Sequence, residues 1–158
     1  MPNSRATASK PQLNLDTFLP YRLSVLSNRV SDAIARQYSE RFNLSIPEWR
    51  IIAVLGQSPN LSAREVASRT AMDKVQVSRA VTSLVSTKRL TRTEDATDAR
   101  ITRLALTAKG RVIYEEVAPL ALHLESLLLS SLSAQERTAL QNLMHKLDRQ
   151  VSLLGARE

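Results

Sequence analysis

Residues 74–86 carry side chains of the types that recognise the edges of base pairs. On a helical wheel, one face holds Val75, Ser78, Arg79, Thr82 and Ser86, with Lys74 and Gln76 beside its N-terminal part. Arginine grips guanine bidentately, glutamine does so with adenine, hydroxyls pair with either, and an outward valine meets a thymine methyl. This spacing therefore favours a helix face that contacts DNA. The alternative is an ordinary solvated helix face.

Local signals predict two short helices that would position this face. Ser62 and Glu65 form the capping pattern S-x-x-E, so a helix should start there, and it should end near Thr70. Asp73 is expected to cap a second helix, because its carboxylate is favoured at the positive end of the helix dipole. One side of that helix is apolar at 3.6-residue spacing: Val77, Ala80, Val81, Leu84 and Val85. Two short helices joined by a tight turn predict a helix-turn-helix.

A β-hairpin is predicted directly after the second helix. Residues 89–94 and 100–106 have strand patterns, and the turn-forming sequence DATDA joins them. A hairpin in this position is a wing, and an arginine at its tip can enter a narrow minor groove. Arg100 is the candidate, with Asp98 expected to orient its guanidinium. The alternative is a solvent-exposed Asp–Arg pair in a loop.

The charge distribution supports the same interpretation. Residues 62–111 hold 11 of the 22 Lys and Arg but only 5 of the 15 Asp and Glu, so this third of the chain carries +6 of the net +7. Concentrated positive charge is typical of nucleic-acid-binding modules, because phosphate contacts release condensed counterions. The predicted DNA-binding residues are Ser62, Lys74, Val75, Gln76, Ser78, Arg79, Thr82, Asp98, Arg100 and Arg103.

The order of these motifs resembles the MarR family of winged helix-turn-helix regulators. The matching segments are LSIPEWRIIAVL (44–55), QVSRAV (76–81), the D-x-R of Asp98 and Arg100, and LTAKG (106–110). The likeness covers about residues 13–154. One departure is Lys88, which stands where such proteins often have glycine, so the turn into the wing is expected to be tighter or differently shaped.

The rest of the chain is expected to complete one regulator domain at residues 13–154, after a disordered arm at residues 1–12. Its winged core would span 45–107, and helices at 15–41 and 108–154 would mediate dimerisation. Apolar stripes at 3–4 spacing support these helices: Leu19, Leu23, Leu26, Val30 and Ile34, then Leu140, Leu143, Leu147, Val151 and Leu154. Both stripes could instead complete the monomer core. Distance from the DNA-contacting segment and the family resemblance favour a homodimer.

Other function classes find little support in the sequence. The chain has no Cys, which excludes disulfides and thiolate metal sites, and no apolar run approaches the roughly 18 residues of a membrane span. His123 and His145 lie outside any metal-ligand pattern, and three scattered glycines form no phosphate-binding loop. We therefore expect no catalytic residues, no metal and no cofactor. A soluble, cytoplasmic location on the nucleoid is expected.

The resemblance also implies a small-molecule effector between the dimerisation helices and the DNA-binding lobe. The residues expected there are Tyr21, Ser24, Asn28, Arg29, Trp49 and Arg50, with Phe42 nearby. Trp49 is the sole Trp, and with Arg50 it could form a flat apolar wall beside a cation that binds a carboxylate. Trp49 could equally be ordinary core and Arg50 an exposed charge. The segments 18–38 and 46–50 look most like MarR-type repressors of aromatic-acid degradation, some of which sense the acid and others its coenzyme A thioester.

Together these features predict a mainly helical protein with a small β-wing, a winged helix-turn-helix that dimerises through its N- and C-terminal helices. Its expected partners are a double-stranded DNA operator with an inverted repeat, a second copy of the chain, and an aromatic acid or its coenzyme A thioester. The expected role is transcriptional repression released by that ligand. The alternative is a winged-helix protein that binds nucleic acid without regulating transcription.

Overall fold

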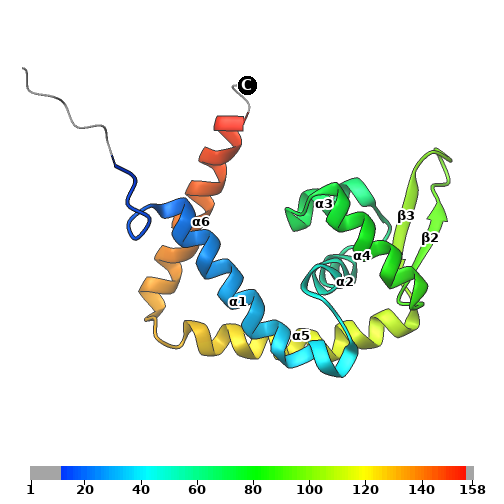
Figure 1. The fold of residues 1–158 in the computed structure, drawn as a ribbon, viewed down its shortest axis with the longest axis horizontal. Helices are drawn as coiled ribbons and strands as arrows, with labels where there is room; N and C mark the ends of the chain where they lie inside the picture. The colour runs from blue at the N-terminus through cyan, green and yellow to red at the C-terminus, as the bar shows by residue number, and fades with distance from the viewer. Residues whose placement is uncertain (1–11, 156–158) are drawn as a thin grey trace, which may run out of the picture. The chain divides into compact units, whose positions relative to one another are not determined.

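The computed structural model describes residues 12–155, and Figure 1 shows the arrangement of their helices and strands along the chain. The predicted N-terminal arm, apart from Gln12, lies outside the described residues. The chain divides into two compact units, residues 1–46 and residues 47–158.

The first unit is dominated by helix α1 (Leu19–Phe42). The helix begins four residues later than expected from the sequence. Pro20, in the first turn, explains this later start. If the helix began near residue 15, Pro20 would lie in its interior, where proline has no backbone N–H to donate and its ring would clash with the carbonyl of a preceding residue. Asn43 ends the helix in the left-handed conformation, with φ 47°. Tyr38, near this end, is fully buried.

The second unit contains the predicted helix-turn-helix. Helix α2 (Ile46–Gln57) leads into a two-residue strand β1 (Leu61–Ser62), followed by α3 (Ala63–Thr70) and α4 (Lys74–Ser86). The predicted limits of α3 and the predicted cap of α4 are confirmed. The buried core of this unit is aliphatic: Ile51, Ile52, Leu55, Val66, Val77, Val81, Leu84, Leu104, Ile113 and Val117. It includes the apolar side expected for α4, except that Val85 is only half-buried.

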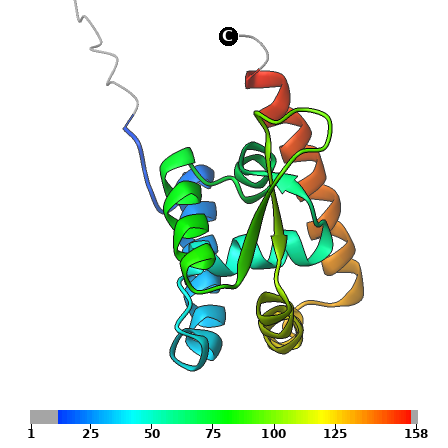
Figure 2. The same cartoon turned by 90° about the vertical axis from the view of Figure 1, so that its right-hand side faces the viewer.

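The wing consists of β2 (Leu90–Glu94) and β3 (Thr102–Leu106), which run antiparallel with Leu90 opposite Leu106 and Glu94 opposite Thr102. Figure 2 shows these two strands side by side, leading to the tip loop. The strand order is β1-β3-β2, with Leu61 paired to Leu104. Strand β1 was not expected, because two residues carry no alternating pattern. The predicted mainly helical fold with a small β-wing is confirmed.

Two long helices follow the wing. Thr107 caps α5 (Ala108–Leu129) by accepting a hydrogen bond from the N–H of Gly110 at 3.1 Å. A capping box of Ser133 and Glu136 begins α6 (Ala134–Gly155), which has no buried residue. Among residues 12–155, no single helix is long and apolar enough to cross a membrane. Helices α5 and α6 reach that length and composition only as a pair, with a 111° bend between them.

Candidate nucleic-acid interface

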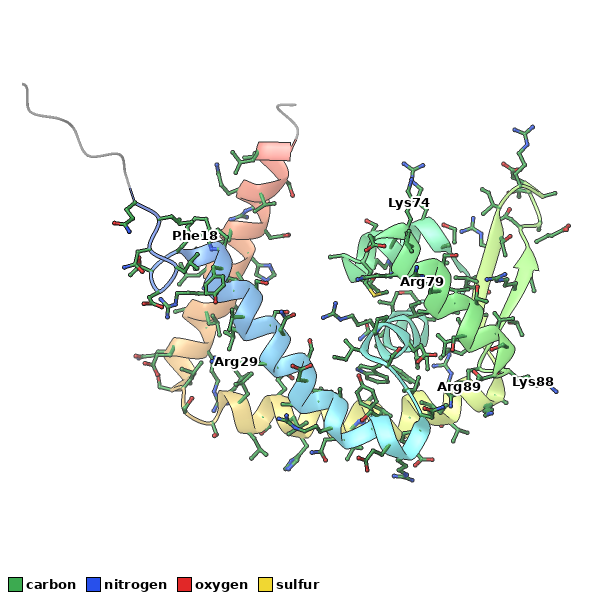
Figure 3. The ribbon with its side chains drawn as sticks, viewed as in Figure 1. Phe18, Arg29, Lys74, Arg79, Lys88 and Arg89 are labelled. Carbon is green, nitrogen blue, oxygen red and sulfur yellow. The ribbon has the colours of Figure 1, made fainter. Side chains whose placement is uncertain are left out.

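The outward face of α4 presents the side chains predicted to contact bases. Asp73 accepts a hydrogen bond from the backbone N–H of Gln76 at 2.8 Å, which fixes the start of the helix. Burial of the apolar side then leaves the opposite face exposed, including Val75 at 58%. The exposed residues are Lys74, Val75, Gln76, Ser78, Arg79, Thr82 and Ser86. Figure 3 labels Lys74 and Arg79 on α4.

Helix α3 is held at its start by a complete capping box. The backbone N–H of Ser62 donates to Glu65 Oε2 at 2.7 Å, and the N–H of Glu65 donates to Ser62 Oγ at 3.3 Å. The hydrogen bond from the Ser62 backbone is the main cause that lowers the pKa of Glu65. The Ser62 hydroxyl also donates to Glu65 Oε2, at 2.7 Å. Ser62 thus orders the first turn of α3, and its contact with DNA stays a prediction.

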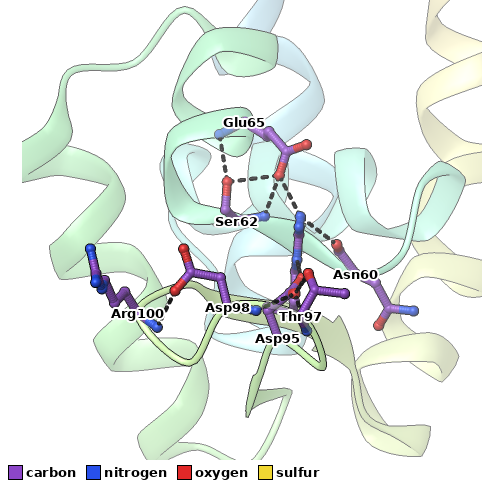
Figure 4. A network of polar contacts seen from close by, with 8 residues as sticks. Asn60, Ser62, Glu65, Asp95, Thr97, Asp98 and Arg100 are labelled. Atoms are coloured by element: carbon purple, nitrogen blue, oxygen red, sulfur yellow. Dashed lines mark hydrogen bonds and ion pairs between the residues drawn. The ribbon is translucent and has the colours of Figure 1, made fainter.

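The tip of the wing is organised around Asp95 (Figure 4). Its Oδ1 accepts hydrogen bonds from the backbone N–H and hydroxyl of Thr97, at 2.8 and 2.6 Å, and from the N–H of Asp98 at 3.2 Å. The hydrogen bond from the Thr97 hydroxyl is the largest of several effects that hold the pKa of Asp95 well below its usual range. Asp95 therefore acts as the fixed centre of the turn.

The expected role of Asp98 as a clamp on the Arg100 guanidinium was wrong. Asp98 Oδ1 instead accepts the backbone N–H of Arg100 at 3.0 Å, as in an Asx turn. A backbone donor two residues away is closer and needs no side-chain ordering, so it is preferred over the flexible guanidinium. Arg100 is exposed at the tip, and Asp98 orders the backbone that presents it.

Arg103 joins the wing to α3 through two carboxylates. Its Nε donates to Asp95 Oδ2 at 2.5 Å, and its Nη1 donates to Glu65 Oε2 at 2.9 Å. Nη1 also lies 3.4 Å from the carbonyl oxygen of Asn60. The hydrogen bond to Asp95 is the largest of the causes that raise the pKa of Arg103. The sequence predicted Arg103 as a DNA contact, but the structure places its guanidinium between acids of the protein itself.

The turn from α4 into the wing keeps a glycine-like backbone at Lys88. Its φ is 57°, in the left-handed region, although lysine is disfavoured there. The N–H of Lys88 donates to the carbonyl of Val85 at 3.0 Å, and the N–H of Arg89 donates to that of Leu84 at 2.8 Å. These two bonds form a Schellman motif. Lys88 therefore occupies a backbone conformation that glycine adopts without strain, and the expected difference from the usual turn of the family stays a prediction.

The first turn of α5 is locked onto this same turn. Thr107 donates from its backbone N–H to the Arg89 carbonyl at 3.1 Å and from its hydroxyl to the Lys88 carbonyl at 2.8 Å. A Cβ on Gly110 would lie only 2.1 Å from the Arg89 carbonyl oxygen, so only glycine allows this approach. The first turn of α5 is therefore in direct contact with the turn that ends α4.

Aromatic side chains connect α2 to α5 within the second unit. The rings of Trp49 and Tyr114 stack with centroids 6.5 Å apart and an interplanar angle of 26°. The Arg111 guanidinium lies 5.6 Å from the Tyr114 centroid and donates to the Gly56 carbonyl at 3.0 Å. Trp49 is half-buried. Trp49 therefore stacks on Tyr114, a residue that the sequence spacing gave no reason to join to it, and its role in an effector site stays a prediction.

The six predicted ligand residues divide between the two units. Tyr21, Ser24, Asn28 and Arg29 are exposed on α1, whereas Trp49 and Arg50 are half-buried on α2. Because they belong to different units, their assembly into one effector site remains a prediction.

Two features of the interface were not predicted from the sequence. Ser83 donates from its hydroxyl to the buried Glu48 at 2.6 Å, which ties α4 to α2. A groove of about 480 Å³ also lies between α3, α4 and the wing, and the cations Arg64, Lys74 and Arg92 line it. Only the overall excess of Lys and Arg in residues 62–111 could have indicated it.

The known proteins that this chain resembles are transcriptional regulators. A family model described as MarR family matches residues 42–101. The chain is 30% identical over 108 residues to the HTH-type transcriptional regulator BilQ of Clostridium symbiosum, covering 68% of this chain and 75% of that protein.

Solved structures share the fold over nearly the whole chain. The MarR/EmrR family transcriptional regulator from Acinetobacter sp. ADP1 is 28% identical with a TM-score of 0.81, covering 89% of this chain and 99% of that one. BpsR of Bordetella bronchiseptica, whose DNA binding is regulated by 6-hydroxynicotinic acid, is 22% identical with a TM-score of 0.76, covering 87% and 98%. At this lower identity the likeness to BpsR concerns the fold alone.

Proposed function

The chain belongs to the MarR family of transcriptional regulators, and from this membership we propose that it is a homodimeric repressor whose operator is an inverted repeat. We further propose that a small aromatic acid, or its coenzyme A thioester, releases it. A non-catalytic role, with action at the nucleoid, is part of this proposal. The observation that carries it is the exposed face of α4, with Arg79 and its neighbours directed outward beside a wing tipped by Arg100.

The dimer proposal is supported by apolar side chains that the single chain leaves uncovered. On α6, Leu143 is 56% exposed and Val151 is 66% exposed. Further exposed leucines on α1 and α5 include Leu26 and Leu122. Apolar faces of this extent are typical of protein interfaces. A two-fold dimer would present two copies of α4, so the half-sites should lie about one helical turn, roughly 10 base pairs, apart.

The effector proposal is supported by the stacked pair of Trp49 and Tyr114, with the Arg111 guanidinium 5.6 Å from the centre of the Tyr114 ring. Flat aromatic walls with nearby cations suit an aromatic carboxylate. The regulation of BpsR by 6-hydroxynicotinic acid offers a precedent in the same fold. A ligand that shifts α5 at Tyr114 would act on α4 through the contacts of Thr107 and Gly110 with the turn at Arg89.

The test begins with selection of DNA from a pool of random-sequence duplexes by the full chain. We expect an inverted repeat to be enriched and to bind about 10³-fold or more tightly than a scrambled duplex at the same salt concentration. A panel of phenolic acids and their thioesters, added to the complex in gel-shift assays, should contain a compound that releases it. Tight binding without sequence preference would instead support the alternative, an architectural nucleic-acid-binding protein.

A further inference from the structure

A continuous chain of polar contacts runs from the tip of the wing to the first turn of α3 (Figure 4). Asp98 holds the backbone of Arg100, and Asp95 holds the backbone of Asp98 through its Oδ1. The other oxygen of Asp95 accepts the Nε of Arg103, whose Nη1 reaches Glu65. Each link has an ionised carboxylate as its acceptor, and hydrogen bonds to ionised groups are stronger as a class than those between neutral groups.

Two backbone hydrogen bonds close the tip loop, from the N–H of Asp95 to the carbonyl of Ile101 and from the N–H of Ile101 to the carbonyl of Asp98, each 2.9 Å, but neither of them joins the tip to α3. Strand β1 pairs with β3 over only two residues, and that pairing lies at Leu104 and Arg103. Beyond Thr102 the hairpin has no partner strand. Arg103 lies on β3 where that strand pairs with β1, and its side chain binds the carboxylate of Asp95, which orders the tip of the wing.

We propose that Arg103, held between Asp95 and Glu65, is a positioning residue that fixes where the wing presents Arg100 to DNA. The proposal rests on the proposed DNA-binding function and revises the expected role of Arg103. Its guanidinium uses both Nε and Nη1 within the protein and acts on DNA through Arg100. Ordering the tip before binding would lower the conformational cost of forming the complex.

Removal of a negative charge from the network tests this proposal, because the two possible roles of Arg103 predict opposite changes in DNA affinity. Glu65→Gln and Asp95→Asn each remove a negative charge near the interface. If Arg103 were simply a phosphate contact, each substitution would free it and strengthen DNA binding. If Arg103 positions the wing, each substitution breaks the connection and weakens binding despite the more positive charge. Glutamine also suits the capping position, so Glu65→Gln preserves the start of α3.

Glu94→Gln is the matched control. Glu94 is exposed on β2, and no hydrogen bond or ion pair involves its side chain among residues 12–155. This substitution makes the same charge change outside the network. It should leave operator affinity unchanged or increase it.

The experiment measures the affinity of the full chain for its selected duplex by fluorescence anisotropy at fixed salt. We expect Glu65→Gln and Asp95→Asn to weaken binding about two- to fivefold, the range for coupling between partly exposed ion pairs. Arg103→Gln should weaken it at least as much. In an Arg100→Ala background all three effects should disappear, because their shared route to the DNA has been removed.

Tighter or unchanged binding by both carboxylate variants would overturn the proposal. Additive effects of Arg103→Gln and Arg100→Ala would also overturn it, since they would show that Arg103 acts independently. Asp95→Asn decides the question if Glu65→Gln proves less stable. Failure of the wild-type chain to prefer any duplex would contradict the proposed function instead, and the two failures are therefore distinct.

Discussion

At the scale of single residues, two arginines are assigned different tasks on DNA. Arg79 lies on the outward face of α4, where a guanidinium can reach a guanine edge. Arg100 lies at the wing tip, where the negative potential of a narrow minor groove attracts cations. Arg79 should therefore determine sequence preference, and Arg100 should mainly add affinity for DNA.

Alanine substitutions separate these tasks. Arg79→Ala should cost about 1–3 kcal/mol on the selected duplex and relax preference at one base position, with little effect on a scrambled duplex. Arg100→Ala should weaken binding without changing preference in the major groove. The measurements are gel-shift titrations at fixed salt against single-base variants of the duplex. If both variants bind the selected duplex with the affinity of the wild-type chain, the assignment of the DNA-binding site to α4 and the wing tip is wrong.

Lys88 offers a test of stability at a single residue. Because its φ of 57° suits glycine, Lys88→Gly should stabilise the fold by about 0.5–1 kcal/mol, after the greater freedom of glycine in the unfolded chain is allowed for. Urea denaturation at one protein concentration would measure this. Lys88→Ala keeps the unfavourable backbone and should not stabilise. An equal gain from alanine would attribute the effect to loss of charge.

At the scale of elements, signals within four residues of one another were predictable. The starts of α3, α4, α5 and α6 each follow a Ser, Thr or Asp cap that the sequence displays. Contacts between distant segments were not, because nothing local marks them. Arg103 and Glu65 are 38 residues apart, and Trp49 and Tyr114 meet only when α2 packs near α5. Asp98 was misjudged because a backbone N–H competed successfully for its carboxylate.

The two capping boxes give the fold a defined response to acid. The pKa values of Glu65 and Glu136 are lowered from the ordinary 4.5, mainly by the backbone N–H groups of Ser62 and Ser133. A carboxyl with a lowered pKa contributes stability above its ordinary value and loses it as pH falls through the lower value. The urea concentration at the midpoint of unfolding should therefore decrease as the pH is lowered below about 4.5. Glu136→Gln should flatten this fall, and an unchanged pH profile would contradict the assignment.

At the scale of the whole molecule, the proposed switch obeys thermodynamic linkage. An effector that weakens operator binding must itself bind the DNA-bound protein more weakly by the same factor, about 5- to 150-fold for typical couplings of 1–3 kcal/mol. Helix α5 is the element suited to carry this coupling, because its first turn contacts the turn after α4 and Tyr114 stacks on Trp49.

The linkage is measured by titrating the releasing compound into free protein and into protein saturated with the selected duplex. Trp49→Phe and Arg50→Gln should weaken binding of an aromatic acid while leaving the ligand-free affinity for DNA nearly unchanged. Loss of DNA affinity in parallel would indicate damage to the fold. Equal ligand affinity in both wild-type titrations would rule out ligand-driven release.

The central claim, that a dimer places two copies of α4 on one inverted repeat, is tested most directly by hydroxyl-radical footprinting of the full chain on its selected duplex. We expect protection of two symmetric half-sites about one helical turn apart, roughly 10 base pairs, on one face of the DNA. The stoichiometry should be two chains per duplex. Protection of a single asymmetric half-site by one chain would contradict the account.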